Sequence, residues 1–282
     1  MEGLETALRA AAADYRGTPV LALQDEIVLS RRFGLKRREV QAAALAAGLM
    51  PLRYVRNLGT LGLSGQLALL RSCVAVVGLG GLGGYNVEAL ARSGAGRIIA
   101  VDADRFEEHN LNRQMLSSEA ALGRPKAELA AERVAAINGA VEVTAVIARL
   151  ERSSAMSLLR GADVIVDALD NIPDRLLLQD AAAEMGKPLV HGAIAGFLGQ
   201  CMTVLPGDRG LYWLYPEGQA PEHGFEASAG TPAATPMLVA ALQVQETVKL
   251  ITGKGELLRH CLLLVDGESG QVQRVEFPPS GD

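Results

Sequence analysis

The stretch Cys73-Val-Ala-Val-Val-Gly-Leu-Gly-Gly-Leu-Gly83 places five apolar residues before glycines in the spacing Gly-x-Gly-x-x-Gly. This pattern predicts a buried strand that turns tightly into a helix. The glycines let the backbone approach a phosphate, and the helix N-terminus offers unpaired N–H groups. A second apolar run, 97–101, ends at Asp102, whose carboxylate can hold ribose hydroxyls. Together they predict a nucleotide-binding unit and leave ATP, NAD and FAD open.

Apolar runs and helical periods alternate between residues 73 and 191. Strands separated by helices of this length predict an α/β fold with a doubly wound, mainly parallel Rossmann-like sheet. After residue 191 the pattern favours antiparallel strands that extend the sheet, one apolar helix at 237–252 and a long loop at 207–236. The expected strands are 73–77, 97–101, 141–147, 163–167, 189–191, 197–205, 262–266 and 271–277, and the expected earlier helices are 83–93, 126–137, 153–159 and 173–184.

Residues 1–50 are rich in Ala and Leu and predict a helical N-terminal extension ahead of a nucleotide-binding domain at 51–282. Its expected helices are 4–14, 21–33 and 37–49, with Gly34 separating the last two. The basic stretch 31–40 also fits a helix-turn-helix, but a small helical cap is the simpler interpretation in an acidic chain. Residues 53–65 read as a connector.

Composition excludes several classes of protein. The chain has 282 residues, 49% of them hydrophobic, and a formal net charge of −5, so no basic field favours nucleic acid as a partner. Its three cysteines lie far apart and form neither a disulfide framework nor a thiolate zinc site. No apolar stretch is long enough to span a bilayer, and no signal peptide opens the sequence. We expect a soluble, cytoplasmic protein without membrane contact.

Two groups of polar residues after the second strand distinguish among the nucleotides. The run Asn110-Leu-Asn112-Arg113-Gln114 follows Asp102, and Lys126 begins a helix after Gly-Arg-Pro. A triphosphate carries about four negative charges and requires fixed cations and amide donors. A nicotinamide dinucleotide has little use for such a cluster, so these residues favour ATP.

A further acidic group follows the strand predicted at 163–167. Asp170 and Asn171 lie just beyond its end at Asp167, at the carboxyl edge of the sheet, where open α/β folds bind ligands. A carboxylate at this edge can hold Mg²⁺ between phosphate oxygens. Asn171 and Asp174 also suit the cap of the next helix.

Three more motifs occur in a fixed order around these residues. Arg53-Tyr-Val-Arg56-Asn lies upstream, and His191-Gly-Ala-Ile-Ala-Gly-Phe-Leu-Gly-Gln200 and Gln243-Val-Gln-Glu-Thr-Val-Lys-Leu-Ile-Thr-Gly253 lie downstream. With the glycine turn, this series resembles the ThiF/MoeB/HesA superfamily, bacterial relatives of ubiquitin-activating enzymes, over most of the chain. The resemblance makes 51–282 a ThiF-type ATP-binding adenylyltransferase domain.

The resemblance implies roles for individual residues. Arg113 and Lys126 would hold the phosphates, Asp170 would position Mg²⁺, and Arg56 would reach the β- and γ-phosphates in the neighbouring subunit of a homodimer. These four are the expected catalytic residues. The expected nucleotide-binding residues are Gly78, Gly80, Gly81, Gly83, Asp102, Asp104, Asn110, Asn112, Gln114 and Asn171.

The chain departs from the family pattern in its cysteines. Many relatives carry two C-x-x-C pairs that bind zinc, but the corresponding region, 211–216, has none, so no structural zinc is expected. Some relatives place a cysteine in the long loop, whereas residues 207–236 contain none, which argues against thiol transfer there. Cys201 lies in an apolar strand and is expected to be an inert core residue.

The activity implied is ATP-dependent adenylation of the C-terminal glycine of a ubiquitin-like sulfur-carrier protein ending in Gly-Gly, with release of pyrophosphate. Molybdopterin, thiamine and other sulfur-transfer pathways all fit. Three alternatives stay open at this point: activation of a small carboxylate such as a modified tRNA nucleoside, a nicotinamide-dependent oxidoreductase, and a catalytically silent binding protein.

Overall fold

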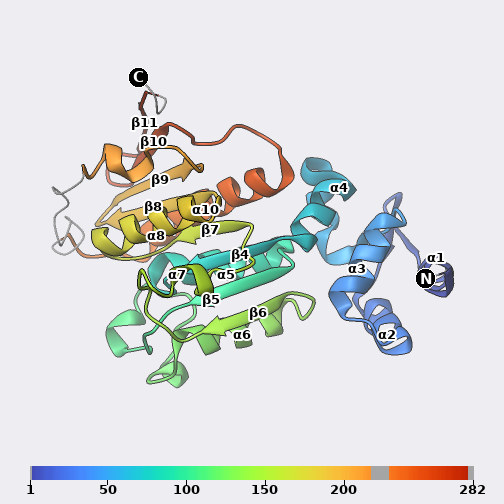
Figure 1. Cartoon of the computed structure of the whole chain (residues 1–282). Coiled ribbons are helices and arrows are strands. Elements are labelled where there is room, and N and C mark those ends of the chain that lie inside the picture. Colours follow the sequence, from blue (N-terminus) through green and yellow to red (C-terminus); the bar gives the residue numbers. More distant parts are fainter. Residues whose placement is uncertain (1, 217–228, 279–282) are drawn as a thin grey trace.

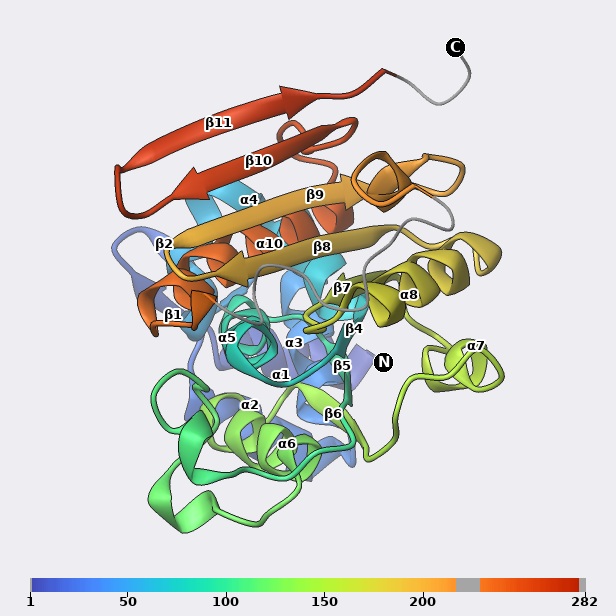
Figure 2. The same cartoon turned by 90° about the vertical axis from the view of Figure 1, so that its left-hand side faces the viewer.

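The fold is organised by an eight-stranded sheet with strand order β11-β10-β9-β8-β7-β4-β5-β6 (Figures 1 and 2). The structure is a computed structural model and describes residues 2–216 and 229–278. Strands β4 to β8 run parallel, and β9, β10 and β11 continue the sheet in antiparallel fashion, which confirms the predicted architecture. The strands are β4 (Cys73–Val77), β5 (Arg97–Val101), β6 (Glu142–Val146), β7 (Val164–Asp167), β8 (Leu189–Ala195), β9 (Leu198–Val204), β10 (Cys261–Asp266) and β11 (Gln271–Glu276).

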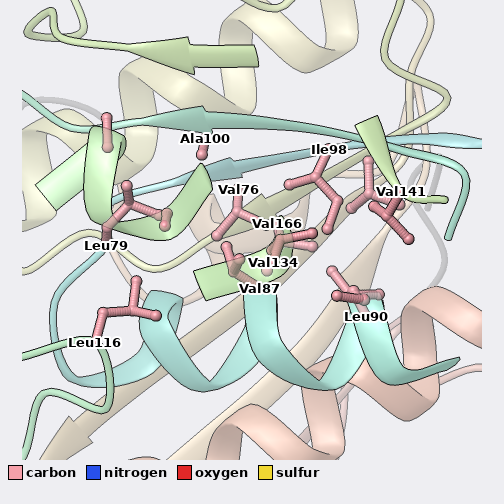
Figure 3. Close-up of a cluster of buried hydrophobic side chains, with 14 of the residues drawn as sticks. Val76, Leu79, Val87, Leu90, Ile98, Ala100, Leu116, Val134, Val141 and Val166 are labelled. Atoms are coloured by element: carbon pink, nitrogen blue, oxygen red, sulfur yellow. The ribbon is translucent and has the colours of Figure 1, made fainter. Parts of the chain in front are cut away.

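Helices cover the two faces of the sheet. Val74 and Val76 of β4 pack in the cluster that includes Val87 and Leu90 of the first helix after the glycine turn (Figure 3). The alternate residues of β4 pack on the opposite face, because successive side chains of a strand point to opposite sides. One face carries α5 (Gly81–Ser93), α6 (Lys126–Ile137) and α10 (Ala234–Thr252), and the other carries α7 (Ala155–Leu158) and α8 (Ile172–Glu184).

The winding of the sheet reverses at β4. The chain runs from β4 through β5 to β6 at one edge, and then returns to pair β7 with the other side of β4. The amide of Ala168 donates to the carbonyl of Val77 at 2.9 Å. The loops that follow β4 and β7 therefore begin side by side at the edge of the sheet. A crevice at such a switch point is the usual ligand site of an open parallel sheet.

The N-terminal segment lies at one end of the molecule, beside α4 (Figure 1). Its three predicted helices are present, but the first ends at Ala10 instead of residue 14. The chain then forms two short antiparallel strands, and the second of them pairs in parallel with a third strand to complete a small separate sheet. The elements are α1 (Glu2–Ala10), β1 (Ala13–Tyr15), β2 (Thr18–Leu21), α2 (Leu23–Phe33), α3 (Arg37–Ala46) and β3 (Met50–Pro51).

The structure differs from the sequence prediction in two loops. The connector expected at 53–65 is wrong: η1 (Leu52–Asn57) and α4 (Leu58–Arg71) occupy it, with Gly62 breaking the helix at φ 67°. The long loop expected at 207–236 contains the short helix η4 (Gly210–Trp213), and α10 already begins at Ala234. Residues 217–228 of that prediction lie outside the described residues. Within the described part, no helix is long and apolar enough to cross a membrane.

The turn between β4 and α5 requires glycine at two positions. Gly78 adopts φ 88°, and a Cβ there would lie 2.5 Å from the carbonyl oxygen of Ala168. A Cβ on Gly83 would lie 1.8 Å from the carbonyl oxygen of Gly78. The helix therefore packs directly on the backbone of the turn, which fixes the turn against β7.

We expect Gly83→Ala to lower the free energy of unfolding by about 1–3 kcal/mol, because the added methyl group overlaps backbone that cannot move away cheaply. Urea denaturation measures the change. Gly59→Ala is the matched control, since a Cβ there meets nothing within 4 Å. Equal unfolding midpoints for the two variants would contradict the packing described above.

Candidate functional site

A pocket of about 570 Å³ opens at the switch point of the sheet and is called the switch-point pocket below. Its walls are the loops that follow β4, β5, β6 and β7, together with the start of α8. The structure brings ten of the residues expected from the sequence to this pocket: Gly78, Gly80, Gly81, Asp102, Asp104, Arg113, Gln114, Lys126, Asp170 and Asn171.

Asp102 connects two walls of the pocket. One carboxylate oxygen accepts the backbone N–H of Leu79 at 2.7 Å, and the other accepts that of Asp104 at 2.7 Å. Burial raises the pKa of Asp102 above its usual value, while nearby Lys126 and the two amide donors act in the opposite direction. The carboxylate is therefore held rigidly beside the glycine turn, at the end of β5.

Lys126 is a nearly buried cation in the same pocket. Its side chain is only 7% exposed, and Nζ lies 3.0 Å from Oδ2 of Asp104, whose side chain is 71% exposed. Pro125 precedes it and α6 begins at Lys126 itself, so the fold fixes where the side chain starts. A buried ammonium paired with an exposed carboxylate remains available to an anion that enters the pocket.

Arg113 and Gln114 also line the pocket. The guanidinium of Arg113 donates to the carbonyl of His109 at 2.9 Å and to Oδ1 of Asn112 at 2.8 Å, and its stem lies near Gly81. Gln114 is 7% exposed, and its Oε1 is buried with no hydrogen-bond partner among the described residues. Such an orphaned polar atom needs a partner from a ligand or water.

Asp170 and Asn171 follow β7 at the mouth of the pocket. Asn171 caps α8, since its Oδ1 accepts the amide of Asp174 at 2.9 Å. Asn171 also donates to Oδ1 of Asp170 at 3.3 Å. Asp170 is exposed and lines the pocket. Asn171 thus combines the capping role expected from its position with a place in the pocket wall.

Four expected residues do not line the pocket. Asn110 is buried and accepts the amide of Glu107, so it shapes the loop instead of the pocket wall. Asn112 donates to the carbonyl of Thr231 at 3.2 Å. Gly83 packs under the glycine turn, and Arg56 is exposed on η1 away from the pocket. Within one copy of the chain, Arg56 therefore belongs to a different surface.

Two arginines of the pocket were not predicted as site residues. Arg149 lies in the loop after β6, and its guanidinium is 3.8 Å from Asp174. Arg175 is buried on α8 and donates to the carbonyl of Leu169 at 2.9 Å. Both arginines follow a predicted strand and could have been proposed on that ground. The sequence does not show, however, which residues of such a loop point into the pocket.

The cysteines lie outside the pocket. Cys73, Cys201 and Cys261 are all buried and free. Burial raises the pKa of the Cys201 thiol strongly, so it is held as a neutral thiol in the core. Its burial confirms the prediction of a core residue.

Comparison with known proteins agrees with this geometry. The family model described as "ThiF family" matches residues 54–281. The SAMP-activating enzyme E1 of Haloferax volcanii is 40% identical over 235 residues, covering 82% of this chain and 86% of the relative. The sulfur carrier protein adenylyltransferase of Thermus thermophilus is 40% identical over 235 residues, covering 79% and 86%. For MOCS3 of Mus musculus, 39% identical over 231 residues, the match covers 80% of this chain and half of the relative.

Solved structures show the same fold. The structure of Escherichia coli MccB with ATP superposes with a TM-score of 0.69 at 18% identity, covering 99% of this chain and 88% of that one. PaaA superposes with a TM-score of 0.66 at 20% identity, covering 98% and 81%. The sequence motifs, the switch-point pocket and the match over residues 54–281 lead to one conclusion: the chain belongs to the ThiF family.

Proposed function

We propose that this chain transfers AMP from ATP to the C-terminal glycine carboxylate of a small ubiquitin-like sulfur-carrier protein ending in Gly-Gly. The observation that carries the proposal is the meeting of Lys126, Arg113 and Asp170 around the glycine turn. Relatives named as SAMP-activating and sulfur-carrier adenylating enzymes support the choice of substrate. A nicotinamide-dependent oxidoreductase would leave the two cations without a role.

The chemistry needs alignment and charge compensation. A carboxylate oxygen of the carrier attacks the α-phosphorus of ATP, the bond to the oxygen bridging the α- and β-phosphates breaks, and that oxygen leaves with pyrophosphate. Lys126 and Arg113 offset the charge that develops on the phosphates, and no side chain has to act as nucleophile. Gln114 gains a partner for its buried Oε1 when a nucleotide donor group enters the pocket.

Mg²⁺ fits the acidic residue at the mouth of the pocket. Among the described residues, no three His, Cys, Asp or Glu side chains cluster as a metal cage. Mg²⁺ does not need such a cage, because it keeps waters and takes other ligands from phosphates, with one or two protein carboxylates. Asp170 would hold the ion in this way and so neutralise part of the triphosphate charge.

The proposal includes the assembly of the chain. Residues 51–282 form the ATP-binding adenylyltransferase domain, and residues 1–50 are an extension of it. The exposed Arg56 completes the site of a second subunit in a homodimer, which accounts for its place outside its own pocket. Three buried free thiols agree with a protein that works in the reducing cytoplasm.

Lys126→Ala and Arg113→Ala should each reduce carrier-dependent exchange of pyrophosphate into ATP by about 10²- to 10³-fold, because each removes a fixed donor from the developing charge. Arg124→Ala is the matched control: Arg124 precedes the same helix but forms an ion pair with Glu132 outside the pocket. Exchange close to the wild-type rate in both pocket variants would show that the phosphates bind elsewhere.

Arg56→Ala and Lys126→Ala should each lose most of the exchange alone and should complement each other when co-expressed. In a mixed dimer one site carries both defects and the other is intact, so random pairing restores about one quarter of wild-type exchange. Double-tag purification confirms that mixed dimers form. An Arg56→Ala homodimer with normal exchange, or mixed dimers without recovery, would rule out action across the interface.

A further inference from the structure

A second pocket of about 570 Å³ adjoins the switch-point pocket on the α8 face of the sheet. Arg175 and Ile194 line both pockets, so the two pockets are neighbours at these residues. Strands β8 to β11 form its floor, with Gln200 of β9 and Leu264 of β10 facing it. An extended chain lying in the second pocket could therefore bring its end to the edge of the switch-point pocket.

A polar chain runs across three strands on this same face of the sheet. Asp167 of β7 and His191 of β8 are paired in register, and both are 0% exposed. Nδ1 of His191 lies 2.7 Å from Oδ2 of Asp167, and Nε2 lies 3.0 Å from Nε2 of Gln200. Neither Asp167 nor His191 lines the switch-point pocket, and the adenylation chemistry above gives them no task.

The hydrogen bonds fix the direction of the chain. The Asp167 carboxylate can only accept, and it already accepts the amide of Leu169 at 3.0 Å, so Nδ1 of His191 carries the proton. Burial lowers the pKa of His191; the hydrogen bond and charge of Asp167 oppose this and Arg175 adds a smaller lowering, so the net shift favours the neutral ring. Nε2 of the ring is then an acceptor, and the amide nitrogen of Gln200 must donate to it.

This leaves the carbonyl oxygen of the same amide for the second pocket. Oε1 of Gln200 has no hydrogen-bond partner among the described residues, and Gln200 lines the pocket. An oxygen held in this orientation accepts from a donor and repels a carbonyl. An extended peptide tail carries a donor of this kind in the N–H group of each of its peptide bonds.

We propose that Gln200 binds a backbone N–H of the carrier's tail through Oε1, and that Asp167 and His191 are positioning residues that hold the amide in this orientation. The inference rests on the proposed function, because it requires a tail that passes through the second pocket to the α-phosphate. The inference adds a residue that binds the tail of the carrier and is separate from the residues that hold ATP.

The test uses ubiquitin-fold carriers ending in Gly-Gly, made by ligation, in which each of the last three peptide bonds is replaced in turn by an ester. The ester removes one N–H. In pyrophosphate exchange, one of the three esters should raise the carrier KM of the wild-type chain about five- to tenfold, the effect of one neutral hydrogen bond. The KM for ATP should not change.

Variants test whether the ester effect on KM depends on Gln200 and on the residues that hold it. Gln200→Leu should raise the KM for the normal carrier by a similar factor and should abolish the difference between the normal and the ester carrier. His191→Asn keeps a donor for Asp167 but cannot reach Gln200, so it should weaken the discrimination in the same way. Gln245→Leu is the matched control, since Gln245 is exposed on α10 at the other face. Melting with and without ATP checks that each variant folds.

Separate outcomes overturn the two proposals. If the wild-type chain exchanges no pyrophosphate with any normal carrier, the proposed function fails, and this inference fails with it. If exchange is normal but no ester raises the KM, or the ester effect survives in Gln200→Leu, only the role of Gln200 is refuted. Loss of discrimination in Gln200→Leu but not in His191→Asn would refute the positioning role.

Discussion

The site depends on one close approach, between the backbone that follows β4 and the backbone that follows β7. A Cβ on Gly78 would collide with the carbonyl of Ala168, so only glycine lets the two loops leave the sheet from adjacent points. This contact places the glycine turn and Asp170 on opposite sides of one crevice. Asp102 then fixes the turn from the β5 side through the amide of Leu79. Three loops far apart in the sequence thus become one rigid pocket before any ligand enters.

The charges of the pocket are balanced, which affects how it selects its ligand. Its described lining includes four cationic side chains and four carboxylates: Arg113, Lys126, Arg149, Arg175, Asp102, Asp104, Asp170 and Asp174. A balanced pocket does not attract anions by net charge, so selectivity comes from where each charge is fixed. Lys126 is buried while its partner Asp104 is exposed, so the fold holds the ammonium in a fixed place at the pocket. Under the proposed function, the carboxylates of the lining would favour a triphosphate that arrives with its metal ion.

The sequence predicted what depends on pattern and missed what depends on three-dimensional contact. The strands around β4 were predictable because long apolar runs and glycine spacing carry a strong signal, and the residues at their carboxyl ends necessarily meet at one edge. Strands β1 and β2 were missed because three or four residues show no period. Arg175 could not be assigned because its role depends on turning back to the carbonyl of Leu169. The hydrogen bond between His191 and Asp167 could not be predicted either, because it depends on the register in which β7 and β8 pair.

The N-terminal segment is joined to the sheet domain by buried polar contacts, and this bears on how Arg56 is presented. Asn138, at the end of α6, donates to the hydroxyl of Tyr54 at 2.7 Å, and that hydroxyl lies 3.4 Å from Gln41 of α3. Gln41 in turn donates to the buried carboxylate of Glu26. Burial raises the pKa of Tyr54, so its hydroxyl stays protonated and can serve both neighbours. Because Tyr54 and Arg56 share the short helix η1, the contacts that hold the first also fix where the second lies on the surface.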